Sequence, residues 1–179
     1  MTANQRARWP ADRSVAATEE SVEHRSKVHE EIKQRKPFRS TAQEAVIGLL
    51  RTSSLVRGYF DRLMAPHGLT LQQFNVLRIL RGAGPDGLPT LEIGARMVER
   101  TPGVTRLIDR LVRKKMVARS RSTDDRRVVY CRLTDVGRNT LTAVDAVVGN
   151  ADESAMGALT ERQLENLIEL LDRARSALD

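Results

Sequence analysis

One stripe of a short predicted helix carries charged and hydroxyl side chains at a spacing that suits nucleic-acid recognition. Arg106, Asp109, Arg110 and Arg113 fall on the same helical face, and Thr105 lies beside them. In the DNA major groove arginine reads guanine, while threonine meets a base edge or a thymine methyl group. The stripe therefore predicts a surface that reads double-stranded DNA, with Arg106 and Arg110 as the best candidates for base or phosphate contacts.

The opposite face of this helix is apolar, and the residues before it predict where the helix begins. Four apolar residues recur at i, i+3, i+4 and i+7, as a buried stripe does: Val104, Leu107, Ile108 and Leu111. The Thr101 hydroxyl is expected to cap the first turn, with Pro102 at a position where a missing N–H costs nothing. Thr101, Gly103 and Thr105 lie near the helix N-terminus, where backbone N–H groups favour a DNA phosphate.

The residues that follow alternate in polarity like the two strands of a hairpin. Val117 to Arg121 leads outward, and after a polar turn the stretch from Val128 to Leu133 returns. In the return strand Val129, Cys131 and Leu133 share one face. The tip, residues 124–127, is a charged finger that can place an arginine in a narrow minor groove.

The net charge of +7 is unevenly placed along the chain. Residues 100–138 hold 12 basic and 4 acidic residues, a net charge of +8, whereas residues 139–179 hold 3 basic and 8 acidic ones, a net charge of −5. This asymmetry is expected of a polyanion-binding surface on a body that does not bind DNA. Three arginines of the hairpin are predicted to contact phosphates, which position a protein without specifying sequence: Arg119, Arg121 and Arg126.

Capping boxes and apolar periodicity predict the helices that surround this site. The boxes at Thr41–Glu44, Thr70–Gln73 and Thr160–Gln163 each open a helix, and the first of these helices is long and apolar. A short helix over Thr90–Met97 precedes the basic helix, and the two together form a helix-turn-helix. The fold class is therefore mainly α with a small β-wing.

These motifs together resemble the MarR family of winged helix-turn-helix transcription regulators. The resemblance lies in the helix TPGVTRLIDRL, the positively charged strand, the D-x-R tip formed by Asp125 to Arg127, and the closing LTxxG of Leu133 to Gly137. It spans roughly residue 41 to the C-terminus and is most specific between residues 69 and 138. It implies that Arg127 enters the minor groove and that Asp125 braces it through a salt bridge.

The resemblance also implies how the chain is organised. The winged helix-turn-helix would span about residues 69–134, with recognition helix Thr101–Lys115, and dimerisation helices would span about 41–66 and 135–179 within a MarR-type domain of residues 41–179. Residues 1–40 match nothing and read as a charged extension, flexible or docked loosely as a helix over Glu19–Lys36 that Pro37 closes. A basic arm that touches DNA or the partner subunit is the alternative for this extension.

The implied partners are a double-stranded DNA operator and a second copy of the chain. By resemblance, the protein is a homodimeric bacterial repressor on a palindromic operator, released by a small effector, often an aromatic acid. Arg51, Arg57 and Tyr59 lie on the helix that would face such a ligand, but a core role for the tyrosine and surface roles for the arginines are the better explanation of each. The effector-binding residues therefore stay unassigned.

Little in the sequence supports other classes of function. There is no Gly-rich phosphate loop, HExxH or CxxC motif, so neither catalysis nor a cofactor nor a metal site is expected. Cys131 is expected to be an inert buried thiol rather than a redox switch. One cysteine and the lack of a long apolar run suggest a cytoplasmic protein, nucleoid-associated when bound to DNA, with no membrane partner. The remaining alternatives are a weakly specific architectural DNA binder and a winged-helix module that binds ligand or protein without DNA.

Overall fold

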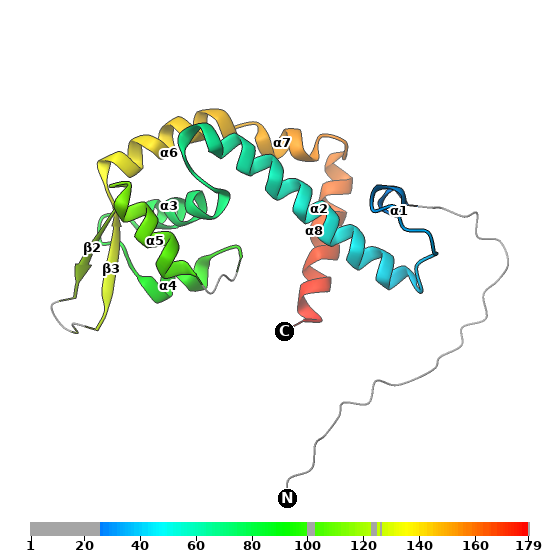
Figure 1. Ribbon diagram of the computed structural model, residues 1–179, viewed down its shortest axis with the longest axis horizontal. Helices are drawn as coiled ribbons and strands as arrows, with labels where there is room; N and C mark the ends of the chain where they lie inside the picture. The colour runs from blue at the N-terminus through cyan, green and yellow to red at the C-terminus, as the bar shows by residue number, and fades with distance from the viewer. Residues whose placement is uncertain (1–25, 100–102, 123–124, 126, 179) are drawn as a thin grey trace, which may run out of the picture. The chain divides into compact units, whose positions relative to one another are not determined.

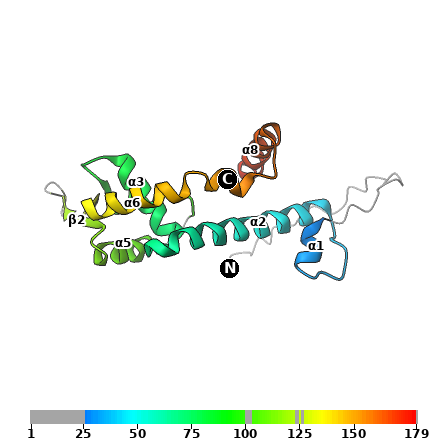
Figure 2. The ribbon, with the colours of Figure 1, turned by 90° about the horizontal axis from the view of Figure 1, so that it is seen from above.

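The computed structural model describes residues 26–99, 103–122, 125 and 127–178 (Figure 1). The chain divides into two compact units, residues 1–48 and residues 49–179. The long helix α2 (Thr41–Met64) begins in the first unit and continues into the second. A second view shows α2 as one unbroken helix (Figure 2).

The first unit holds α1 (Lys27–Glu31) and the start of α2. The predicted helix over Glu19–Lys36 is wrong at its C-terminal end, because Lys33 adopts a left-handed backbone with φ 53° and stops it. The part of that prediction before Ser26 lies outside the described residues.

The start of α2 also differs from the prediction by one residue. Ser40, rather than Thr41, caps the helix, since its Oγ accepts a hydrogen bond from the Gln43 N–H at 3.2 Å. The Gln43 side chain in turn accepts a hydrogen bond from the Arg39 N–H at 2.8 Å. Both Ser40 and Thr41 carry a suitable hydroxyl, and the position of Gln43 three residues after Ser40 favours the serine.

The second unit holds a winged helix-turn-helix followed by a helical C-terminal segment. Its elements after α2 are η1 (Ala65–His67), α3 (Leu71–Ala83), β1 (Leu88–Pro89), α4 (Thr90–Arg96), α5 (Val104–Arg113), β2 (Val117–Arg121), β3 (Val129–Leu133), α6 (Asp135–Val148), α7 (Ala151–Met156) and α8 (Glu161–Ser176). The prediction of a mainly helical fold with a small β-wing is confirmed. The capping box at Thr70 is confirmed as well, with Gln73 N–H to Thr70 Oγ1 at 3.2 Å and Thr70 N–H to Gln73 Oε1 at 3.3 Å.

The sheet contains a third strand that the sequence pattern did not predict. Its order is β1-β3-β2, and both pairings are antiparallel. Leu88 pairs with Cys131 and Pro89 with Tyr130, a strand too short to show an alternating pattern in sequence. Gly87 makes this approach possible, because its φ is 70° and a Cβ there would lie 2.1 Å from the Cys131 carbonyl oxygen.

The core is aliphatic, and α3 lies at its centre. This helix packs against α5, α6 and β3 (Figure 1). The side chains that are fully buried come from α2, α3, α4, α5, β3 and α6: Met64, Val76, Leu77, Leu80, Ile93, Ile108, Leu111, Cys131, Leu141 and Val144. The helices before and after the wing therefore enclose one core, which fixes α5 and the wing on a single scaffold.

Contacts at the junction between β3 and α6 explain why the LTxxG sequence has its threonine and its glycine. The Thr134 hydroxyl donates to the Lys115 carbonyl at 2.7 Å and accepts from the Gly137 N–H at 3.1 Å, so it caps α6 and ties it to the end of the recognition helix. A Cβ on Gly137 would lie 2.3 Å from the Met116 carbonyl oxygen. Only glycine fits where α6 crosses this loop.

The C-terminal helices leave apolar side chains exposed. No residue of α8 is buried, and Ile168 is 60% exposed. α6 ends at Val148 and α7 begins at Ala151, so the helical segment is interrupted at Gly149 and Asn150. Val136 and Val147 of α6 are half exposed because they lie off the helical stripe that Leu141 and Val144 form.

Within the described residues, no helix combines the length and the apolar character needed to cross a membrane. The assignment of residues 41–66 and 135–179 as dimerisation helices stays a prediction.

Candidate nucleic-acid interface

The recognition helix is shorter than the predicted span of Thr101–Lys115. It begins at Val104 after Gly103, while Thr101 and Pro102 lie outside the described residues. Its C-terminal end is set by Lys115, which takes a left-handed backbone with φ 58°. The Met116 N–H then bonds to the Leu111 carbonyl at 3.0 Å and the Lys115 N–H to the Val112 carbonyl at 2.8 Å, a closure that ends the helix.

The two faces of α5 divide as predicted. Leu107, Ile108 and Leu111 are buried, which confirms the apolar stripe. Thr105, Arg106, Arg110 and Arg113 are exposed on the other side. In the part of the chain that the structure describes, no acidic side chain pairs with these three arginines. Their guanidinium groups are therefore available to phosphates or base edges, although the contacts themselves stay a prediction.

Arg119 has ion-pair and hydrogen-bond partners that Arg121, another predicted phosphate contact, does not have among the described residues. Its Nη1 donates to Asp109 Oδ1 of α5 at 2.5 Å, and its Nη2 donates to the Thr105 carbonyl at 3.3 Å. The Arg119 side chain is 29% exposed and that of Asp109 is 45% exposed. The wing strand is thus tied to two successive turns of the recognition helix.

The tip of the wing carries the ion pair that the family resemblance implied. The Arg127 Nε donates to Asp125 Oδ1 at 3.3 Å, and the Arg127 backbone N–H donates to the same oxygen at 2.9 Å. The Arg127 side chain is 92% exposed. Asp125 therefore orients an arginine that projects into solvent, and Arg126, the other predicted tip residue, lies outside the described residues.

A hollow of about 670 Å³ lies between the recognition helix, the wing and the start of α4. Thr105, Arg119, Arg121 and Arg127 line it, so the structure brings these predicted site residues together. Leu91 of α4 lines it too and is 89% exposed. Sequence reasoning missed Leu91, although its position off the stripe of Ile93 and Met97 was a usable signal. An exposed leucine at such a surface can contact a thymine methyl group.

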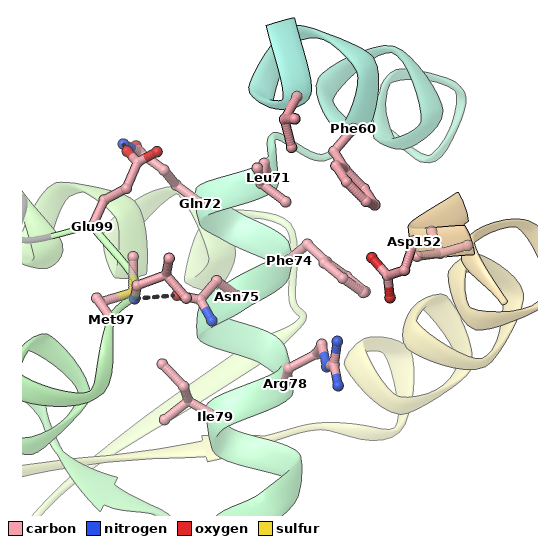
Figure 3. Close-up of a pocket in the computed structure, with 13 residues that line it drawn as sticks. Phe60, Leu71, Gln72, Phe74, Asn75, Arg78, Ile79, Met97, Glu99 and Asp152 are labelled. Carbon is pink, nitrogen blue, oxygen red and sulfur yellow. Dashed lines mark hydrogen bonds between the residues drawn. The ribbon is translucent and has the colours of Figure 1, made fainter. Parts of the chain in front are cut away.

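A second cavity of about 610 Å³ lies beside α3, between α2, the loop after α4, and the end of α6 (Figure 3). Phe60, Phe74 and Ile79 give it apolar walls. Arg78 lies beside Phe74, with its guanidinium carbon 5.7 Å from the ring centroid, and Asp152 faces the same ring (Figure 3). The cavity thus combines aromatic surface with a cation, as small-ligand sites often do.

The loop between α4 and α5 is held at the mouth of this cavity. Glu99 forms an ion pair with Arg57 of α2 at 3.0 Å and accepts a hydrogen bond from Gln72 Nε2 at 2.8 Å. The Val98 N–H donates to Asn75 Oδ1 at 3.1 Å, which Figure 3 shows as a dashed line. The segment that leads into the recognition helix is therefore fastened by side chains that line the cavity.

The side chains that sequence reasoning offered for an effector do not line the cavity. Arg57 reaches it only through Glu99, and Tyr59 packs edge-on against Phe60 with ring centroids 5.4 Å apart. Arg51 is absent from its walls. The lining residues of α3 were missed, because a helix pattern shows which face is apolar but not where a neighbouring helix fails to cover it.

Cys131 is fully buried, as expected, and its sulfur lies 3.6 Å from the Thr90 hydroxyl. Among the described residues, histidine, cysteine, aspartate and glutamate form no group of three that could hold a metal ion.

Comparison with known proteins gives a consistent result. A MarR family profile matches residues 69–129. An HTH-type transcriptional repressor of Mycobacterium bovis is 30% identical over 138 residues, which cover 75% of this chain and 97% of the relative. A MarR transcription factor from Planctomyces limnophilus is 37% identical, with 76% of this chain and 98% of that one covered and a TM-score of 0.60.

A cysteine-to-serine mutant of Escherichia coli MarR, solved in complex with operator DNA, is 28% identical to this chain. The match covers 75% of this chain and 99% of that one, with a TM-score of 0.63. These relatives are transcriptional regulators rather than enzymes.

Proposed function

The chain is a DNA-binding transcriptional regulator of the MarR family, and we propose that it represses its target genes as a homodimer on a palindromic operator. The observation that carries this proposal is the exposed arginine stripe of α5 beside a wing whose tip projects Arg127. A helix in the major groove and an arginine in the adjacent minor groove are complementary ways of reading one half-site.

The homodimer is proposed from the exposed apolar side chains of α2 and α8. Leu49, Leu50 and Leu55 of α2 and Ile168 of α8 are 48–62% exposed in the single chain. Pairing these helices with a second copy would bury them around a two-fold axis. Two recognition helices would then meet half-sites about 10 bp apart.

The proposed site consists of the following residues: Thr101, Gly103, Thr105, Arg106, Arg110, Arg113, Arg119, Arg121, Asp125, Arg126 and Arg127. Arg106 and Arg110 are proposed to contact bases or phosphates, and Arg127 to enter the minor groove. A protein with this role acts at the bacterial nucleoid, in the cytoplasm.

We further propose that a small aromatic acid regulates DNA binding through the cavity beside α3. An aromatic ring would lie against Phe60 and Phe74, and its carboxylate would meet Arg78. Displacement of the contacts at Asn75 or Glu99 would loosen the loop that leads into α5. Titration of the protein with a hydroxybenzoate tests this: binding should fail in Arg78→Ala, and no binding by the unaltered protein would contradict the proposal.

The repressor proposal is tested by selecting binding sites from random DNA duplexes across a series of salt concentrations. An enriched inverted repeat, bound with an affinity that falls steeply with salt, is the expected result. Salt-sensitive binding without an enriched motif would instead support a weakly specific architectural protein. Deleting residues 1–40 adds a second criterion, because a specific repressor keeps its sequence preference without them.

A further inference from the structure

We propose that Asp109 and Arg119 form a brace that sets the distance between the recognition helix and the wing, and that Arg119 is a positioning residue rather than a phosphate contact. The inference rests on the DNA-binding role of α5 and the wing. It corrects the expectation that Arg119 acts like the other arginines of the wing.

The geometry gives Arg119 two partners on one helix. Its guanidinium reaches the Asp109 carboxylate at 2.5 Å and the Thr105 carbonyl at 3.3 Å, so a single side chain spans one turn of α5. Arg119 lies in the middle of β2, opposite Cys131 of β3. A planar guanidinium with several fixed donors holds such an arrangement better than a lysine ammonium would.

The neighbouring arginines provide the contrast. Arg121 follows Arg119 by two residues on the same face of β2 and is exposed as Arg119 is, but no described acidic side chain pairs with it. Arg127 is paired with Asp125 at the tip, has no other ion pair among the described residues, and points into solvent. Of these three arginines, Arg119 is the one whose donors are committed to the recognition helix.

The position of Asp109 is informative because a carboxylate on a DNA-facing stripe should repel phosphate. Replacing it with alanine removes that repulsion and also introduces the residue with the highest helix propensity. Both effects would strengthen DNA binding if Asp109 had no other role. The brace predicts that Asp109→Ala weakens DNA binding instead, because Arg119 would lose the partner that fixes the wing.

A protein that reads two grooves at once depends on the separation of its two reading elements. Backbone pairing holds β2 to β3, but the Asp109–Arg119 pair ties the exposed side of α5 to the wing. Removing this tie leaves the fold intact, since a partly exposed ion pair contributes little to stability. It makes simultaneous insertion of helix and wing less favourable. The distance between the two elements is then no longer fixed in the free protein and must be fixed when DNA binds.

The decisive experiment measures operator affinity against salt concentration for Asp109→Ala and Arg119→Ala, with Arg121→Ala as the matched control. The brace predicts that Asp109→Ala and Arg119→Ala each weaken binding, by about threefold for each half-site. Their slopes of log affinity against log salt should equal that of the unaltered protein. Arg121→Ala should lower the magnitude of the slope by about 0.9 for each phosphate that Arg121 neutralises in the unaltered protein.

The double variant separates the brace from two independent effects. With both side chains removed, the affinity should fall no further than in either single variant. Unchanged or tighter binding by Asp109→Ala would overturn the proposal, and so would a smaller slope for Arg119→Ala. Thermal unfolding of each variant, expected to match the unaltered protein within a few degrees, confirms that the weaker binding does not come from misfolding. This test is distinct from the test of repressor function. If the unaltered protein binds DNA sequence-specifically and the variants do not behave as predicted, the brace alone is contradicted.

Discussion

The winged domain and the C-terminal helix α8 carry equally regular apolar stripes, but only the stripe of the winged domain is fully buried. In α5 the stripe is buried against α3 and β2, and Ile108 and Leu111 have no exposed surface. In α8 no residue is buried, although Leu164, Leu167 and Leu171 recur at helical spacing. The DNA-reading part thus completes its core within one chain, and the incomplete burial of α8 supports the proposal that this helix pairs with a second copy.

The largest effect is expected in the covered stripe. Leu111→Ala should lower the free energy of unfolding by about 2–5 kcal/mol, because it leaves a cavity in a close-packed core. The measurement is denaturant unfolding followed by circular dichroism. Leu170→Ala on the exposed side of α8 is the control and should change the free energy of the winged domain by less than about 0.5 kcal/mol. Equal effects of the two substitutions would remove the contrast between the regions.

The uncovered stripe should determine assembly instead. Ile168→Asp places a charge on the exposed apolar face of α8, so the protein should sediment as a monomer. Operator affinity should then fall by about 100-fold, since a linked second half-site no longer contributes. Glu169→Gln, at the neighbouring exposed position, should remain dimeric. A monomeric unaltered protein would show that α8 does not serve this purpose.

Within the DNA-reading part, the tip of the wing should contribute more to operator affinity than its outer face does. Arg127→Ala should weaken operator binding about tenfold, which corresponds to roughly 1.4 kcal/mol, without changing the fold. Arg132 is the matched control, because its guanidinium lies over the Tyr130 ring at 6.0 Å and is not placed at the tip. Gel-shift titrations would compare the two, and full affinity in Arg127→Ala would argue against a wing in the minor groove.

The smallest effect concerns the loop that joins α4 to α5. Asn75→Ala removes the hydrogen bond to the Val98 N–H and should lower the free energy of unfolding by about 1 kcal/mol. Because Asn75 also lines the cavity, the response of DNA binding to a hydroxybenzoate should weaken in the same variant. Asn166→Ala, on exposed α8, is the control for both measurements. An undiminished response would separate the cavity from the recognition helix.

The sequence predicted the parts of the fold whose signal is local. The Thr70 capping box and the stripe of Leu107, Ile108 and Leu111 each depend on spacing within one helix, and the structure agrees with both. The D-x-R ion pair at Asp125 and Arg127 was implied by the family resemblance and is present. Such features can be read from a single sequence because their partners are only a few residues apart.

Features that depend on distant partners could not be read in the same way. Strand β1 exists because Leu88 meets Cys131 across the sheet, and two residues carry no periodicity. The pairing of Arg119 with Asp109 needs the turn between helix and wing to place them together, so the arginine looked like any other basic residue. The cavity beside α3 arises from the spacing between helices, which apolar patterns do not encode.

The central claim is that the exposed stripe of α5 reads DNA sequence, and site selection with Arg106→Ala tests it most directly. Random duplexes would be selected in parallel with the unaltered protein, with Arg106→Ala and with Arg121→Ala. We expect Arg106→Ala to relax the base preference at one position of each half-site, at a cost of about 1–3 kcal/mol on the preferred sequence. Arg121→Ala should weaken binding uniformly and leave the motif unchanged. An identical motif from Arg106→Ala and the unaltered protein would contradict the claim that this stripe specifies the operator.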